Sequence, residues 1–306
     1  MALYRTMVTA LFCLVAAHLL PVPVRAAESV RNVRFEGNVQ YGVADGQKLL
    51  LDIYRPKAKP APGELRAAVV VVHGGAWQEG NKEEMRDIAI ALANRGYVAI
   101  SISYRLMNEE GTRNTWPAQI DDVQLAVRWL RENAARYAVD PKRISACGGS
   151  AGGHLVTLLA TCETLHPHGA ALTQHSSRVC AAINLAGPTD LTQNFAVGLW
   201  RPLGDQLRGR LFAGKPSGPA AREASPLLHI DAATAPVLIL HGRDDQIVSV
   251  KQSEAFAAAM EKANRSIRLV VIDGEGHGFA RPESLRRMMD EMTDFLARHT
   301  SGAALP

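Results

Sequence analysis

The sequence has few cysteines and little excess charge of either sign, and each shortage excludes a class of protein. Four cysteines among 306 residues are too few for a disulfide-rich scaffold, and none are spaced as a C-x-x-C zinc site. The formal net charge is only +4, with scattered lysines and arginines, so we expect no nucleic-acid partner. With 47% hydrophobic and 21% charged residues, the composition is that of a globular protein rather than a disordered or fibrous one.

A long apolar run at the N-terminus predicts a secretory signal peptide over residues 1–26. Arg5 precedes an uncharged stretch that continues to Val24, and small residues follow. This pattern predicts cleavage after Ala26, or alternatively after Ala27, and a secreted or periplasmic protein with no stable membrane insertion after cleavage. An uncleaved membrane anchor is the other alternative, although the apolar heart is short against the ~20 residues that span a bilayer.

Export would permit disulfides among the three cysteines that follow the predicted cleavage site. Three is an odd number, so at least one thiol stays free or pairs between chains. Cys147 lies in a strand-like run and is expected to be a buried free thiol. Cys162 and Cys180 flank a polar, histidine-rich loop, and either they form a disulfide that closes it or both stay free.

Strand-like and helical segments alternate along most of the chain. Residues 67–72 are apolar at every position, as in a strand buried on both faces of a parallel sheet. The alternation predicts an α/β fold, with a mostly parallel, doubly wound sheet of about eight strands and helices on both faces. The expected strands are 48–54, 67–72, 97–104, 144–147, 179–185, 236–240 and 267–272, and the expected helices are 82–95, 117–137, 150–161, 251–263 and 282–299.

The chain after the signal peptide is expected to form a single domain, residues 27–306, because no repeat or long linker divides it. The alternation fails only in residues 190–235, which are rich in glycine, proline and arginine. A stretch of that length without a strand is usually functional or disordered. We interpret it as a small cap insertion over one end of the sheet.

The strongest functional motif is G-x-S-x-G, which spans Gly148 to Gly152 between a predicted strand and a predicted helix. A sharp strand–turn–helix corner exposes the serine hydroxyl at the C-terminal edge of a sheet. The glycines suit the crowded turn, and the N-terminus of the next helix favours developing negative charge. Ser150 is therefore the candidate nucleophile, and a merely structural glycine-rich turn is the alternative.

A second motif, HGGAW from His73 to Trp77, follows the apolar strand directly. A glycine pair at this place leaves backbone N–H groups free to hold an oxyanion in a cavity. The expected oxyanion donors are the amides of Gly74, Gly75 and Ala151, and a simple tight turn is the alternative.

Two loops that follow later strands supply the other candidate catalytic side chains. Asp245 lies after the strand 236–240, and His277 lies after the strand 267–272. The order serine, aspartate, histidine is that of the α/β-hydrolases. The histidine would take the proton of the serine, and the carboxylate would orient the imidazole. Asp244, one residue earlier, stays the alternative acid.

The other histidines have structural interpretations. His73 is expected to hold the oxyanion loop, His154 to pack inside, and His241 to support the loop that carries the acid. Three further histidines lie in the irregular loop between Cys162 and Cys180, where the spacing favours a solvated loop over a metal site. They are His166, His168 and His175.

Taken together, eight motifs resemble the HGG-type bacterial carboxylesterases, which are α/β-hydrolases close to the hormone-sensitive-lipase-like and feruloyl-esterase-like enzymes. In the family pattern H-G-x-x-D-x-x-V the acid falls on Asp245 and the valine on Val248, whereas Ser249 departs from the frequent proline. The resemblance runs from about Gln40 to His299. The motifs are HGGAW, SYRL, WPAQIDDVQLAVRWL, DPKRI, GGSAGGHL, GPTDL, HGRDDQIV and GEGHGF.

The resemblance implies a secreted serine carboxylic-ester hydrolase that works through an acyl-enzyme, with no cofactor or metal. The implied substrates are small-molecule or polysaccharide-linked esters with short-chain or aromatic acyl groups, of the acetyl or feruloyl type. Two alternatives stay open. One is an amide- or formamide-cleaving serine hydrolase, such as an arylformamidase or a peptidase-like enzyme, and the other is a non-catalytic binding protein with the hydrolase fold.

Overall fold

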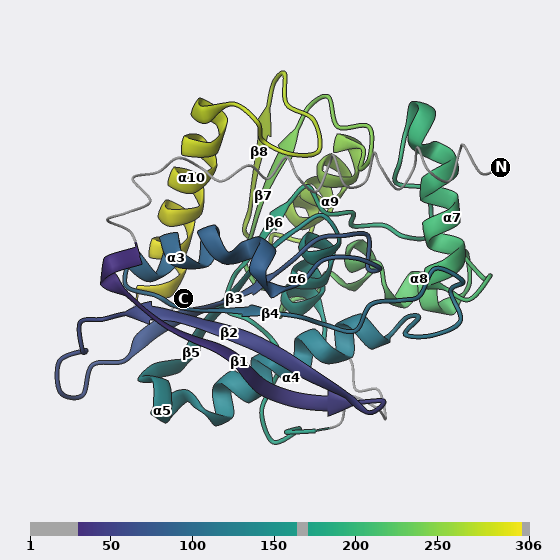
Figure 1. Cartoon of the computed structure of the whole chain (residues 1–306). Coiled ribbons are helices and arrows are strands. Elements are labelled where there is room, and N and C mark those ends of the chain that lie inside the picture. Colours follow the sequence, from purple (N-terminus) through teal and green to yellow (C-terminus); the bar gives the residue numbers. More distant parts are fainter. Residues whose placement is uncertain (1–29, 164–170, 302–306) are drawn as a thin grey trace.

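A central sheet of eight strands organises the computed structural model, which describes residues 30–163 and 171–301 (Figure 1). The predicted signal peptide, His166 and His168 lie outside the described residues. The strand order is β1-β2-β4-β3-β5-β6-β7-β8. The pairs β1/β2 and β2/β4 are antiparallel and the others are parallel. The predicted mostly parallel α/β fold is confirmed.

The predicted elements are found with shifts of their ends, and the largest shift is at β5, which was expected at 144–147 and begins at Val139. The strands are β1 (Val33–Ala44), β2 (Gln47–Pro56), β3 (Arg66–Val72), β4 (Val98–Ile102), β5 (Val139–Gly149), β6 (Ala182–Leu185), β7 (Val237–Gly242) and β8 (Ile267–Ile272). The main helices are α3 (Arg86–Asn94), α4 (Ala118–Glu132), α5 (Ala134–Tyr137), α6 (Ala151–Thr161), α7 (Arg201–Leu211), α8 (Pro219–Glu223), α9 (Val250–Lys262) and α10 (Pro282–Thr300). Within the described residues no helix is both long and apolar enough to cross a membrane.

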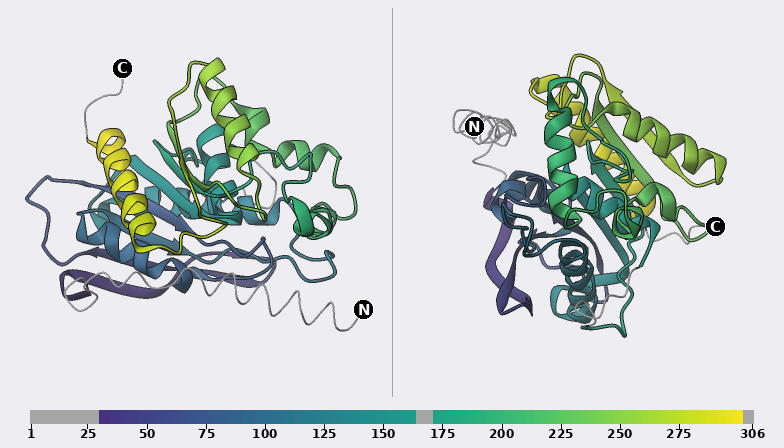
Figure 2. Two further views of the ribbon diagram at one scale, coloured as in Figure 1. Left: turned by 90° about the horizontal axis from the view of Figure 1, so that it is seen from above. Right: turned by 90° about the vertical axis from the view of Figure 1, so that its right-hand side faces the viewer.

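Helices cover both faces of the sheet, and the two faces of β3 show why that strand is apolar throughout. Ala68, Val70 and Val72 belong to a core that also holds buried residues of α4, α6 and α9. The alternate residues Val69 and Val71 belong to a second core with α3 and α10. Figures 1 and 2 show the sheet with helices on its two sides. Because successive side chains of a strand point to opposite faces, a doubly covered strand needs apolar residues at every position.

Strand β1 and two helix breaks differ from the sequence expectation. β1 lies at the edge of the sheet, is largely exposed, and has two register shifts against β2, so it lacks a clear alternation of polar and apolar residues. The helix expected at 82–95 begins as a 3-10 turn, η2 (Lys82–Met85), before α3. The helix expected at 117–137 is divided at Asn133 into α4 and α5.

The segment interpreted as a cap forms helices and turns without a strand, and α7 stands at the right-hand side of Figure 1. The segment holds the 3-10 turns η4 (Gly198–Trp200) and η5 (Pro226–His229) in addition to α7 and α8. Its side chains Phe195, Leu207 and Leu211 are buried in the larger core. The segment is therefore packed onto the domain.

The three described cysteines are free thiols. Cys147 is buried, and burial raises the pKa of its thiol to about 12. The Sγ atom of Cys180 lies 3.3 Å from the Oγ atom of Ser145, while Cys162 ends α6. Of the two alternatives for Cys162 and Cys180, the structure has the one without a disulfide.

Candidate active site

Ser150 occupies a sharp corner between β5 and α6. Its φ of 52° and ψ of −117° lie in a region that non-glycine residues rarely adopt. A Cβ atom at Gly148 would lie 2.4 Å from the carbonyl oxygen of Gly152, and one at Gly152 would lie 2.2 Å from that of Val72. The space beside Gly149 is open. The glycines two residues before and after the serine are therefore the ones that the close approach of the chain requires.

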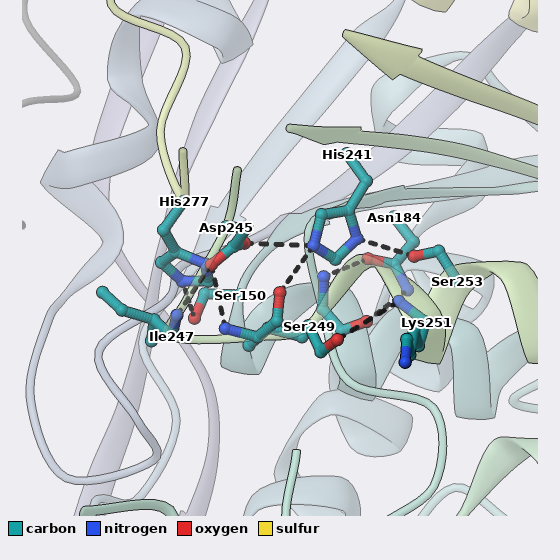
Figure 3. A network of polar contacts seen from close by, with 11 residues as sticks. Ser150, Asn184, His241, Asp245, Ile247, Ser249, Lys251, Ser253 and His277 are labelled. Atoms are coloured by element: carbon teal, nitrogen blue, oxygen red, sulfur yellow. Dashed lines mark hydrogen bonds and ion pairs between the residues drawn. The ribbon is translucent and has the colours of Figure 1, made fainter. Parts of the chain in front are cut away.

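The structure brings Ser150, His277 and Asp245 into contact from three separate loops (Figure 3). The Nε2 atom of His277 lies 2.8 Å from the Oγ atom of Ser150. Its Nδ1 atom lies 2.7 Å from the Oδ2 atom of Asp245. A carboxylate only accepts hydrogen bonds, so Nδ1 carries the proton and Nε2 is left to accept the serine hydroxyl. This arrangement can remove a proton from Ser150.

Asp245, and not its neighbour Asp244, contacts the imidazole. The carboxylate of Asp245 is buried, and its Oδ1 atom accepts hydrogen bonds from the backbone amides of Ile247 and Val248, each at 2.9 Å. Burial alone would raise the pKa of this carboxyl, but the contacts with His277 and His241 hold it well below its usual range. Asp244 is exposed. The carboxylate is thus kept ionised beside His277.

The loop after β3 places unpaired amides beside Ser150. Gly75 has a φ of 95°, and a Cβ atom there would lie 2.1 Å from the carbonyl oxygen of Glu79. Throughout the described chain, no protein acceptor takes a hydrogen bond from the amides of Gly74, Gly75 or Ala151. All three residues line one cavity with Ser150. The arrangement suits an oxyanion, which needs fixed donors in a site that excludes water.

The cavity is small, about 120 Å³, and mostly apolar. Its ionisable side chains are His277 and Glu84. The cap segment contributes Phe195, Trp200 and Leu207 to the apolar wall. The bulky apolar residues of the lining are Trp77, Met85, Ile88, Leu185, Phe195, Trp200, Leu207, Ile247, Phe279 and Met288.

Two buried histidines hold the walls of the site instead of transferring protons. Nδ1 of His154 accepts the indole N–H of Trp77 at 3.2 Å, and its Nε2 donates to the carbonyl of Ala224 at 2.6 Å. His154 thereby joins the oxyanion loop, α6 and the cap segment. His73 donates from Nδ1 to the Gly74 carbonyl at 2.8 Å. Burial lowers the pKa of each imidazole to about 4.

Tyr104 is a supporting residue that reasoning from the sequence missed. Its hydroxyl lies 3.2 Å from the carbonyl oxygens of both His73 and Gly74, and its ring stacks on His73 with centroids 4.3 Å apart. The available signal was its place in the SYRL motif, two residues after the end of β4. His175 contacts Glu132 at the surface, and the described residues contain no cluster that could hold a metal ion.

We expect Asp245→Asn to slow the labelling of Ser150 by a fluorophosphonate by about 10³-fold or more, because the neutral amide no longer stabilises the cationic form of His277 and its NH₂ group can donate to Nδ1, which favours the wrong tautomer. Asp244→Asn, the matched control one residue away, should label within about twofold of the unmodified protein. Rates measured by mass spectrometry check both variants. A large loss in Asp244→Asn with Asp245→Asn unaffected would identify the other carboxylate as the acid.

The two buried histidines predict that stability declines in mild acid. The folded state holds both imidazoles neutral. Their contribution to the free energy of unfolding is therefore complete above the imidazole pKa of the unfolded chain, about 6.5, and is lost as the pH falls toward about 4. Each histidine lowers the free energy of unfolding by roughly 3 kcal/mol between these two pH values. Urea unfolding at several pH values should give a flatter dependence for His154→Gln than for the unmodified protein. Parallel curves would show that His154 does not titrate on unfolding.

Comparison with known sequences places the chain in a family. It matches the BD-FAE family model over residues 51–260. The probable carboxylic ester hydrolase LipM of Mycobacterium tuberculosis is 31% identical over 249 residues, which cover 80% of this chain and 56% of LipM. The esterase LipQ of the same organism is 31% identical over 265 residues, covering 85% and 61%. The chain thus spans about three fifths of the length of these curated relatives.

Solved esterase structures are similar over almost their whole length. Esterase Est2 of Thermogutta terrifontis with propionate bound has a TM-score of 0.73 and 32% identity, covering 90% of this chain and 96% of that chain. The same esterase phosphorylated by paraoxon has a TM-score of 0.72 and 29% identity over 90% and 96%. A truncated carbohydrate esterase from gut microbiota has a TM-score of 0.72 and 26% identity over 88% and 96%. The chain belongs to the BD-FAE family of α/β-hydrolases, and its resemblance to the hormone-sensitive-lipase-like carboxylesterases is confirmed.

Proposed function

We propose that this protein is a serine carboxylic-ester hydrolase that works through an acyl-enzyme. The observation that carries the proposal is the contact chain from Ser150 through His277 to Asp245, at distances of 2.8 and 2.7 Å, beside unpaired backbone amides in one cavity. The ester hydrolases among its relatives and structural neighbours support the same chemistry.

In the proposed reaction, the Oγ atom of Ser150 attacks the ester carbonyl while His277 takes the serine proton. The carbonyl electrons move onto oxygen, where the amides of Gly74, Gly75 and Ala151 hold the oxyanion; one such donor is typically worth about 2.7–4 kcal/mol. His277 then gives its proton to the leaving alcohol, and the acyl group stays on Ser150. A water molecule, deprotonated by His277, releases the acid.

The size and lining of the cavity support esters with a short acyl group. An apolar space of about 120 Å³ has room for a few carbon atoms beyond the reacting carbonyl. The esterase of Thermogutta terrifontis has been seen with propionate and with butyrate bound, which are acids of that size. We propose acetyl, propionyl and butyryl esters as the main substrates, with aromatic acyl esters and polysaccharide-linked esters as further members of the class.

We also propose that the protein is exported to the periplasm or the cell exterior. The support is the pattern of Arg5, an apolar heart and the small-residue end at Ala26, which is typical of a cleaved signal peptide.

We expect Ser150→Ala to abolish hydrolysis of p-nitrophenyl acetate, propionate and butyrate, by about 10⁴-fold or more, because the acyl-enzyme no longer forms. The variant should keep the circular-dichroism spectrum of the unmodified protein. The rate for the unmodified protein should fall in acid, since the base must be neutral to accept the serine proton. Equal activity of Ser150→Ala, or a rate that stays flat to roughly pH 4, would contradict the proposal.

A further inference from the structure

A second histidine contacts the candidate catalytic acid from inside the protein. His241 lies in β7 and is fully buried. Its Nε2 atom is 3.0 Å from the Oδ2 atom of Asp245 and 2.8 Å from the carbonyl oxygen of Val248. Its Nδ1 atom is 2.7 Å from the Oγ atom of Ser253 in α9 (Figure 3). The imidazole therefore connects the acid loop to a neighbouring helix.

The partners of His241 determine which nitrogen carries the proton. A carboxylate oxygen and a carbonyl oxygen both face Nε2, and both only accept hydrogen bonds, so Nε2 carries a hydrogen. In the neutral ring, Nδ1 then accepts the hydroxyl proton of Ser253. The single Nε2–H group of His241 is shared between the Oδ2 atom of Asp245 at 3.0 Å and the carbonyl oxygen of Val248 at 2.8 Å, so Asp245 receives this shared donor in addition to the N–H group of His277.

The two imidazoles donate to the same carboxylate oxygen. Oδ2 of Asp245 accepts His277 at 2.7 Å and His241 at 3.0 Å, while the two backbone amides occupy Oδ1. These four donors fix the plane of the carboxylate. The N–H group of His241 also draws negative charge away from the oxygen that would stabilise a positive charge on His277.

We infer that His241 is a positioning residue that limits the basicity of His277 by sharing the Oδ2 atom of Asp245. The inference rests on the proposed catalytic function of Ser150, His277 and Asp245. With His241 in place, His277 stays neutral to a lower pH and the carboxylate stays in line with its Nδ1 atom. Without that donor, Asp245 attracts the cationic form of His277 more strongly, so the base is lost at a higher pH.

A matched pair of amide variants tests this inference. His241→Gln places a side-chain amide N–H near the former Nε2 position and can still donate to Asp245. His241→Asn reaches only the former Nδ1 position, next to Ser253, and loses that donor. His241→Met replaces the Asn variant if the latter fails to fold, because a thioether fills the space without an N–H group. Thermal unfolding curves identify the variants that are folded, and only these are used for the measurements.

The readout is the pH dependence of ester hydrolysis and of Ser150 labelling by a fluorophosphonate. In His241→Asn we expect the acid limb of both profiles to move up by about one pH unit and kcat to fall about tenfold. KM should change little, because His241 does not line the cavity. His241→Gln should keep the limb within about 0.3 pH unit of the unmodified protein.

The other titratable groups near His277 are the same in all these variants. Glu275 lies in the same loop as His277 and accepts hydrogen bonds from the backbone amides of Ala280 and Arg281 and from the guanidinium of Arg281. Glu84 is in the cavity lining. A shift of the limb in the Asn variant can therefore be assigned to the lost donor.

The outcomes separate this inference from the proposed function. An acid limb that stays in place in His241→Asn, or moves equally in His241→Gln, overturns the role of His241. If Ser150 of the unmodified protein neither hydrolyses esters nor reacts with the fluorophosphonate, the proposed function itself fails. Labelling with a shifted limb but no ester hydrolysis supports the role of His241 in a serine hydrolase of another substrate class.

Discussion

The backbone of Ser150 is the constraint on which the rest of the site depends. The chain turns from β5 into α6 within one residue, at a positive φ, and the turn fits only because Gly148 and Gly152 lack side chains. That same corner starts α6 at Ala151, whose amide is left unpaired within the described structure and lines the cavity with the serine. The strained backbone at one residue thus places both the candidate nucleophile and a candidate oxyanion donor, and the packed sheet maintains that strain.

Burial and partners give four histidines of the site different tasks. His277 is partly exposed and contacts both Ser150 and the ionised Asp245. Among the described residues, no carboxylate forms a hydrogen bond with His73 or His154, and burial keeps both neutral as supports of the oxyanion loop and the cap segment. His241 is as buried as these two but faces the same carboxylate as His277. All four residues are histidines, and their positions relative to Asp245 give them different tasks.

The sequence predicts the centre of this molecule better than its edges, for physical reasons. The run from Ala67 to Val72 is apolar at every position because both its faces are covered, and that signal is visible without a structure. The edge strand β1 is exposed and bulged, so it carries no comparable pattern. The side chains of the candidate nucleophile, base and acid follow from motif order and strand ends, although their contacts become visible only in three dimensions.

The wall of the cavity could not be predicted in the same way. Phe195, Trp200 and Leu207 come from a segment without periodicity, and only the folded chain places them beside Ser150. Tyr104 acts on the oxyanion loop through its hydroxyl, across a separation of thirty residues from Gly74, and no local pattern reveals such a contact. These tertiary contacts set the size of the cavity, so the cavity size could not be read from the sequence.

The most direct measurement is a crystal structure of the protein after reaction with a fluorophosphonate. The proposed mechanism predicts phosphorus bonded to Oγ of Ser150, with the phosphonyl oxygen about 2.7–3.1 Å from the amide nitrogens of Gly74, Gly75 and Ala151. A phosphonyl oxygen that points to solvent, or an adduct on another side chain, would contradict it.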